Sequence, residues 1–351
     1  MVGVPERARR LWRRESDSGA AGPLLRFLRV AKRAMLQPCP MKNLDWLRLA
    51  ALSVLWGGTF LFVSLSLRTF PELTVVFLRV SLAAAAFWLF VLATGRHMPR
   101  DRRTWGAFLV MGLLNNVLPF SLITWEQTQV EGGIASIMNA MTSCFTVVLA
   151  HFLTRDEKLT ARKAAGVLIG LFGAYVLLRP ELVGGVSMRG LGQIAGLTAS
   201  MSLALAGIFG KRFRELSPAQ TATGMLTCSS LVLFPLAMAV DRPWTLSPDL
   251  AAVGAIAGLV LLSTVLAYLL YFSVLRSAGA TNLLLVTLLM PVSAHILGTV
   301  FLGERLYATS VAGMAFIVFG LGIIDGRMLR WLRGVKARDS APFEAQDVEE
   351  K

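Results

Sequence analysis

The chain has 351 residues, of which 55% are hydrophobic and only 16% are charged, and its mean hydropathy is +0.62. Soluble domains are about one quarter charged, so this composition excludes a protein whose surface is mainly in contact with water. The formal net charge of +14 would suit nucleic acid, but its distribution along the chain follows the pattern of a membrane protein and predicts no nucleic-acid partner.

Residues 1–46 form a basic segment ahead of the first long apolar run. No stretch in it is long enough for a signal peptide or a membrane span, so we expect a disordered cytoplasmic arm, with a short interfacial helix around residues 24–28 as the alternative. The sequence from Met41 onward is a normal lead-in to a first helix, so translation could also begin there.

Ten apolar stretches follow, each of about 18–25 residues, the length that crosses roughly 30 Å of hydrocarbon. They predict spans at 47–67, 73–94, 104–125, 132–153, 161–178, 190–210, 219–240, 250–275, 279–302 and 306–324. Residues 325–351 begin basic and end acidic, and we interpret them as a cytoplasmic tail.

The second five spans repeat landmarks of the first five at an offset of 147 residues. Because five is odd, the second half must enter the membrane from the opposite side. We therefore expect an all-α integral membrane protein with ten transmembrane helices in two inverted five-helix repeats, residues 47–178 and 190–324. The landmarks are Gly132, Leu159, Gly166 and Gly173 against Gly279, Leu306, Gly313 and Gly320, with Glu157 matching Glu304.

The charge of the loops predicts the orientation. With the amino terminus inside, the short cytoplasmic loops carry twelve Lys or Arg residues and the opposite loops five. Cytoplasmic loops are enriched in these residues, so we predict that both termini are cytoplasmic and that the protein lies in a cell membrane.

Four segments resemble a known family. They are WGGTF at 56–60, FLRVSLAA at 77–84, RDEKLTARKAAGVLIGLFGAYVLL at 155–178 and GERLYATSVAGMAFIVFG at 303–320. Together they resemble the EamA domain of the drug/metabolite transporter superfamily, over about 47–324. The resemblance implies a secondary transporter of a bacterial inner membrane that exports a small polar metabolite, such as an amino acid, by alternating access.

Several repeated residues are predicted to be structural. Gly166 and Gly313 belong to glycine stripes along which helix backbones can approach closely, within one chain or in self-association, so the protein is predicted to be a monomer or a homodimer. Glu157 and Glu304, at span ends, can cap the following helix. Pro291 is expected to kink its helix, as Pro119 does near Asn115 and Asn116; the first-half counterpart of Pro291 is Cys144.

Ionisable side chains within spans are the default candidates for a substrate site. Arg79 either binds a substrate carboxylate or pairs with carbonyl groups at a helix end, and His295 is either a hydrogen-bonded core residue or a proton relay. Asn116, Trp56 and Tyr268 are proposed to complete the site, with Phe120 and Tyr271 as further aromatic candidates. Each of the four aromatic side chains could equally pack within the bundle or anchor it at the membrane interface. No Asp or Glu falls inside the ten predicted spans, which argues against proton exchange through a membrane carboxylate.

Other functions predict other patterns. A nucleotide-sugar or sugar-phosphate exchanger would need more cavity cations than Arg79, and a membrane enzyme would need converging His, Asp, Glu or Cys residues. The three histidines are scattered, and Cys39, Cys144 and Cys228 lack metal-ligand spacing, so we predict no enzyme activity, no cofactor and no metal. A receptor or scaffold would not need an inverted repeat.

Overall fold

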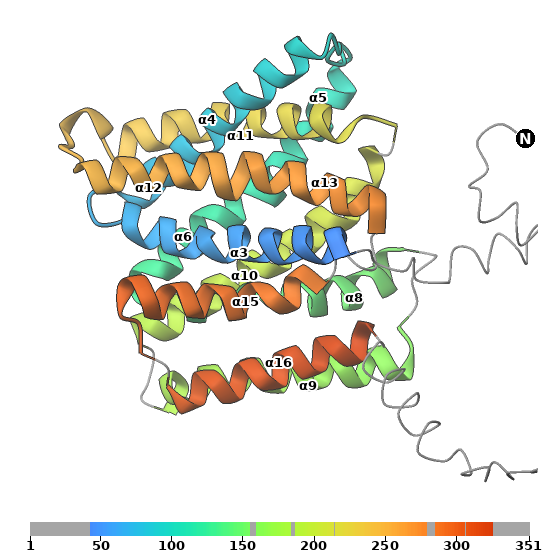
Figure 1. Cartoon of the computed structure of the whole chain (residues 1–351), viewed down its shortest axis with the longest axis vertical. Coiled ribbons are helices and arrows are strands. Elements are labelled where there is room, and N and C mark those ends of the chain that lie inside the picture. Colours follow the sequence, from blue (N-terminus) through green and yellow to red (C-terminus); the bar gives the residue numbers. More distant parts are fainter. Residues whose placement is uncertain are drawn as a thin grey trace, which may run out of the picture.

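The computed structural model describes residues 43–154, 159–183, 187–213, 215–278, 285–305 and 307–325. The regular structure of these residues is entirely helical (Figure 1). The predicted arm up to residue 42, the tail beyond residue 325 and Glu157 lie outside the described residues.

The first repeat contains eight helical elements in chain order. They are α3 (Asn43–Ser66), α4 (Glu72–Ala93), α5 (Arg102–Gly112), η1 (Leu113–Val117), α6 (Leu118–Gln129), α7 (Gly132–Ala140), α8 (Thr142–Leu153) and α9 (Ala161–Val183). Because α5, η1 and α6 are continuous, and α7 is followed almost directly by α8, these elements make five membrane-length segments.

The second repeat follows the same plan. Its elements are α10 (Met188–Phe209), η2 (Gly210–Phe213), α11 (Pro218–Val240), η3 (Pro243–Thr245), α12 (Leu250–Val260), η4 (Leu261–Leu266), α13 (Ala267–Ala278), α15 (Leu285–Leu297), η5 (Gly298–Leu302) and α16 (Ala308–Asp325). Across the described residues, nine helical segments are long and apolar enough to cross a membrane, and Ala308–Ile324 is a shorter apolar tenth. The protein is an all-α, multi-pass membrane protein.

Helix starts follow ordinary capping chemistry. Asp101, Ser187, Ser217 and Asp249 each accept a hydrogen bond from a backbone amide in the first turn of α5, α10, α11 and α12. Such side chains satisfy donors that the helix itself cannot pair, which fixes where each span begins.

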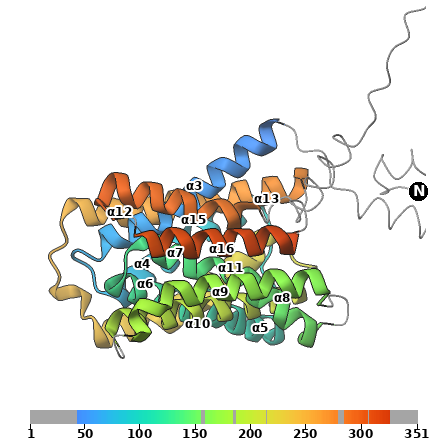
Figure 2. The same ribbon diagram turned by 90° about the horizontal axis from the view of Figure 1, so that it is seen from below.

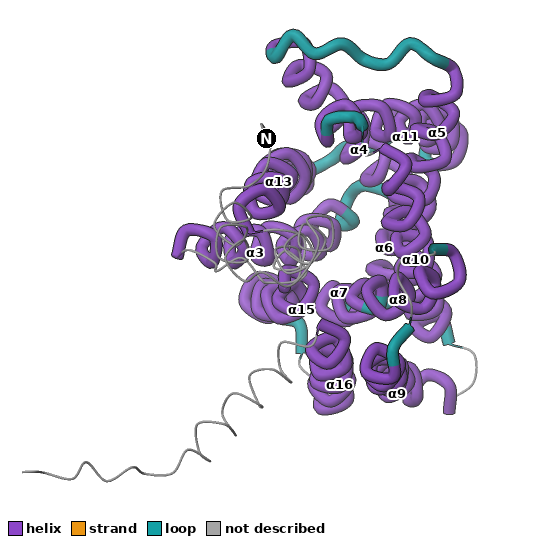
Figure 3. Tube along the Cα trace, turned by 90° about the vertical axis from the view of Figure 1, so that its right-hand side faces the viewer, coloured by secondary structure: helices purple, strands orange, loops and turns teal. Residues whose placement is uncertain are grey.

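Helix pairings show the symmetry of the two repeats. The second helices of the two repeats, α4 and α11, pack on each other. The last helices of the two repeats, α9 and α16, also pack on each other. Likewise α3 packs on α15, α12 and α13, whereas α10 packs on α7, α8 and α6. Figures 1 to 3 show α9 and α16 side by side at one edge of the bundle.

Glycines bring α9 and α16 into close contact. A Cβ atom on Gly320 would lie 2.5 Å from the carbonyl oxygen of Gly166, and one on Gly173 would lie 2.8 Å from that of Gly313. Backbone atoms cannot rotate away as side chains can, so this crossing depends on the missing Cβ atoms. The predicted glycine stripes of Gly166 and Gly313 therefore lie at a contact within the chain.

Candidate functional site

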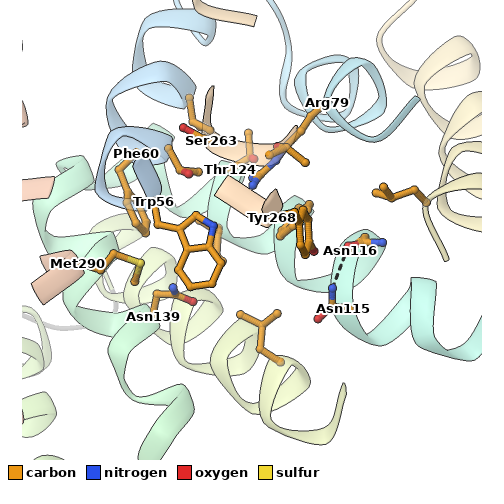
Figure 4. Close-up of a pocket in the computed structure, with 17 residues that line it drawn as sticks. Trp56, Phe60, Arg79, Asn115, Asn116, Thr124, Asn139, Ser263, Tyr268 and Met290 are labelled. Carbon is orange, nitrogen blue, oxygen red and sulfur yellow. Dashed lines mark hydrogen bonds between the residues drawn. The ribbon is translucent and has the colours of Figure 1, made fainter. Parts of the chain in front are cut away.

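A cavity of about 200 Å³ lies between the two repeats. Its wall combines eight apolar side chains with nine polar ones, so it offers more polar groups than most small-molecule sites. The polar lining residues are Thr59, Arg79, Asn115, Asn116, Thr124, Asn139, Ser263, Thr264 and Tyr268. Ten of the lining side chains are labelled in Figure 4.

Arg79 is the charged side chain among the described residues that line the cavity. It projects from α4, and its guanidinium carbon lies 4.0 Å from the centroid of the Phe120 ring, a cation–π contact. Its Nε atom is buried and has no hydrogen-bond partner, and no carboxylate of the described residues lies within ion-pair distance. The cavity therefore holds a positive charge that the described protein does not neutralise (Figure 4).

Two π-helical segments place polar residues on the cavity wall. In η1, the Leu118 amide donates to the Leu113 carbonyl five residues earlier, and Asn115 and Asn116 face the cavity. In η4, the Ala267 amide donates to Leu262 in the same way. π-Segments are rare and concentrate at functional sites. Here they occur at equivalent places in the two repeats, and η4 brings Ser263 and Thr264 to the cavity.

Hydrogen bonds hold these polar residues in place. Asn115 Nδ2 donates to Asn116 Oδ1 at 3.1 Å, and Asn116 Nδ2 donates to Ser229 Oγ of α11 at 3.0 Å. The Ser263 hydroxyl donates to the Leu55 carbonyl of α3 at 2.7 Å. Each π-segment is thus tied to a neighbouring helix, which keeps the polar wall ordered.

Three of the four aromatic candidates line the cavity, namely Trp56, Phe120 and Tyr268. Tyr271 instead packs on Trp56, with ring centroids 5.7 Å apart. Sequence reasoning did not single out Asn139, Ser263, Thr264 or Met290. Ser263 and Thr264 are an isolated polar pair within the apolar run 250–275, a signal that could have identified them.

His295 does not line the cavity. It is buried in α15, where its ring lies against Gly133 at the start of α7, and its Nδ1 atom has no hydrogen-bond partner among the described residues. The structure therefore brings Trp56, Arg79, Asn116 and Tyr268 together and places His295 apart from them.

Glu304 links the two repeats. Its carboxylate accepts hydrogen bonds from the Gly132 amide at 2.9 Å and the Gly133 amide at 3.1 Å. It thus caps α7 of the first repeat, whereas sequence reasoning assigned it to the following helix, α16. Gly303, with φ +67°, ends η5 immediately before Glu304. Partial burial raises the pKa of Glu304 although both amides oppose the shift.

Pro291 lies inside α15 without ending it, and its counterpart Cys144 is buried in α8. The first repeat instead breaks at Met141, between α7 and α8. The break at Met141 in the first repeat thus has no counterpart at Pro291, where α15 continues.

The expectation that no Asp or Glu lies within a span is wrong. The predicted third span ends at Trp125, but α6 continues to Gln129. Glu126 is 0% exposed within that helix. Asp45, ahead of the predicted first span, is likewise buried in α3, where it accepts a hydrogen bond from Ser277 at 2.6 Å.

Comparisons with known proteins agree with this architecture. A model of the EamA-like transporter family matches residues 46–179 and again 190–324. An uncharacterized inner membrane transporter of Escherichia coli, YedA, is 26% identical over 278 residues, covering 79% of this chain and 89% of its own. A probable amino-acid metabolite efflux pump of Escherichia coli is 25% identical over 293 residues, covering 81% of this chain and 95% of its own.

A solved crystal structure shares the fold, with a TM-score of 0.59 at 17% identity, and covers 81% of this chain and 98% of its own. The family model alone matches well over half of the chain, in two consecutive copies that contain the cavity and its lining. The chain therefore belongs to the EamA-like transporter family, and it is a membrane transporter of small molecules rather than an enzyme.

Proposed function

We propose that this protein exports a small metabolite that carries a carboxylate group, such as an amino acid, across a bacterial inner membrane. It works by alternating access, as a monomer or homodimer with both termini in the cytoplasm. The observation that carries the proposal is Arg79, a cavity-lining cation that no described carboxylate pairs. Binding a substrate carboxylate would supply the missing partner, because the guanidinium fork matches a carboxylate in two parallel hydrogen bonds.

The cavity lining from the second repeat supports an amphipathic substrate. The residue 147 positions after Arg79 is Leu226, which also lines the cavity, and Leu203 occupies the position equivalent to Trp56. The second repeat thus contributes an apolar side chain where the first contributes Arg79. A substrate with one charged end and one apolar end fits such a wall better than a uniformly polar one.

One property favours an amino acid over a nucleotide sugar or sugar phosphate. Phosphate groups call for several cations, whereas Arg79 is the charged lining residue in the described part of the chain. The relative named as a probable amino-acid metabolite efflux pump adds support from similarity.

Counterflow in proteoliposomes tests the proposal. Vesicles are loaded with a pool of unlabelled amino acids, and entry of the isotopically labelled pool is followed by mass spectrometry. Selective exchange by the full chain should fall at least about tenfold in Arg79→Ala, the equivalent of 1.4 kcal/mol. Arg79→Lys should recover it only in part, because lysine keeps the charge but lacks the planar fork.

Arg96→Ala is the matched control, since Arg96 is exposed and does not line the cavity. Equal exchange in the Arg79 and Arg96 variants would remove Arg79 from the binding site. Exchange of a sugar-phosphate pool, with none of the amino-acid pool, would favour the alternative substrate class.

A further inference from the structure

One buried carboxyl group has no part in the cavity. Glu126 lies in α6, three residues before the helix ends at Gln129, so it is about 5 Å from that end at helical rise. Its side chain is 0% exposed, and neither carboxyl oxygen has a hydrogen-bond partner among the described residues. Ionisable groups are costly inside a membrane span, and where they occur they mark functional sites by default.

Two glycines of α10 make the room for this group. A Cβ atom on Gly196 would overlap both carboxyl oxygens of Glu126, and one on Gly192 would lie 3.5 Å from the Glu126 carbonyl oxygen. The carboxyl group therefore lies directly against the backbone of α10, with no room for a hydration shell. A carboxylate without donors or counter-charge would be very unfavourable there, so the packed arrangement requires the neutral acid.

Charged groups on the surrounding elements do not compensate for Glu126. Within the described chain, none of them forms a hydrogen bond or ion pair with its carboxyl group. The elements packed against α6 are α10, η1, α4, α3 and α7. Their charged residues are Arg189 of α10, Glu72 and Arg79 of α4, Asp45 and Arg48 of α3, and Glu131, which precedes α7 and pairs with Arg189 at 2.9 Å.

The helix that buries Glu126 also forms the cavity wall. Thr124 lines the cavity, and Glu126, two residues later, points about 200° further around the same helix, at 3.6 residues per turn. On the other side of the contact, α10 contributes Leu203 to the cavity. A rearrangement that opens the cavity by separating α6 from α10 would therefore expose Glu126 to water.

The corresponding contact of the second repeat differs. There α13 packs on α3, and the position 147 residues after Glu126 is Ser273. That contact also buries an acid, Asp45, but its carboxylate accepts a hydrogen bond from Ser277 at 2.6 Å. A buried carboxyl group without a donor among the described residues is thus found at the α6–α10 contact and not at its counterpart, which favours a function specific to that contact.

We infer that Glu126 is a proton-binding site that makes the opening of the α6–α10 contact depend on pH. While α6 and α10 are packed together, the group is the neutral carboxylic acid. When they separate, it releases its proton to the water that enters the contact and becomes a carboxylate, and it takes up a proton from the same water before they close again. A higher pH therefore favours the separated state, and the effect of this equilibrium on transport rests on the proposed transport function.

Infrared spectroscopy tests the proton site without any substrate. The full chain in lipid nanodiscs at neutral pH should show the carbonyl stretching band of a protonated carboxylic acid. Glu126→Gln should remove this band. Glu131→Gln, the matched control at an ion-paired carboxylate, should retain it. Absence of the band from the wild type, or its persistence in Glu126→Gln, would overturn the assignment.

The pH dependence is tested by counterflow in proteoliposomes with the amino-acid pool, with equal pH on both sides and at two pH values one unit apart. Release of one proton changes the balance between the packed and separated states by up to tenfold per pH unit, since one pH unit is 1.36 kcal/mol. Exchange by the wild type should change by up to this factor, and in Glu126→Gln the ratio of the two rates should be close to one. A variant that still responds like the wild type would overturn the pH dependence. If the wild type exchanged no amino acid, the substrate proposal would fail, whereas the infrared band would still decide the proton site.

Discussion

Replacing Glu304 with alanine should destabilise the contact between the two repeats. Glu304 accepts hydrogen bonds from the first two amides of α7, at 2.9 Å and 3.1 Å, across 172 and 171 residues of sequence. Truncation leaves two helical donors at a partly buried position without an acceptor. It also removes a negative charge from the positive end of the helix dipole.

The size of the effect follows from these contacts. A hydrogen bond to a charged group contributes about 1.5–3 kcal/mol, and a charge near a helix terminus about 0.3–1 kcal/mol. The site is partly exposed, so water can reach part of the freed donors. We therefore expect Glu304→Ala to lower the free energy of unfolding by about 2–4 kcal/mol, with Glu304→Gln intermediate because its amide oxygen still accepts.

Thermal unfolding of the purified protein in detergent measures this change. Each kcal/mol corresponds to roughly 2 °C in a chain of this size, so Tm should fall by about 4–8 °C. Glu215→Ala is the control, since it removes a carboxylate from an exposed position and should change stability by less than about 0.5 kcal/mol. Equal Tm values for the two alanine variants would show that the cap between the repeats is energetically unimportant.

Three further outcomes are expected. Gly320→Ala should destabilise the protein by about 1–3 kcal/mol relative to Gly254→Ala in thermal unfolding, because a Cβ atom meets the backbone of α9 at the first position and nothing within 4 Å at the second. Burial raises the pKa of Glu304, so the folded state binds this proton more tightly; the contribution of this group to stability should be fully present below about pH 4.5 and be lost as the pH rises through the raised value, with a flatter pH profile of thermal unfolding in Glu304→Gln. Phe120→Leu removes the cation–π contact that positions Arg79 and should weaken amino-acid counterflow several-fold, whereas Phe120→Tyr should retain it.

Hydropathy and repeat spacing predict most of this fold because both are patterns in the sequence itself and need no knowledge of which distant residues come into contact. A span must be apolar over a length set by the bilayer, so the third segment is recognisable from its composition even though it contains Pro119. Glycines repeated at seven-residue spacing indicate a close helix crossing, and Gly166 and Gly313 lie at one. Arg79 is a site candidate from its position within a span alone, and the structure places it on the cavity wall.

Features that depend on a distant partner could not be predicted in this way. The run from Glu126 to Gln129 has the composition of a loop, and its first residue is buried only because Gly196, 70 positions later, lacks a side chain. The π-segment at Leu261–Leu266 contains no proline that would indicate it. The capping of α7 by Glu304 could not be predicted either, since the capped helix belongs to the other repeat.

The differences between the repeats bear on the direction of transport. In an inverted-repeat transporter, the inward-open and outward-open states arise when the two repeats exchange conformations, so identical repeats would give the two states equal energies. Arg79 and Glu126 both belong to the first repeat, and the equivalent positions of the second repeat hold Leu226 and Ser273. A bound carboxylate and a bound proton would therefore each act on the first repeat and not on the second. A ligand shifts an equilibrium only by its different affinity for the two states, so this asymmetry is what would allow substrate charge and pH to favour one state over the other.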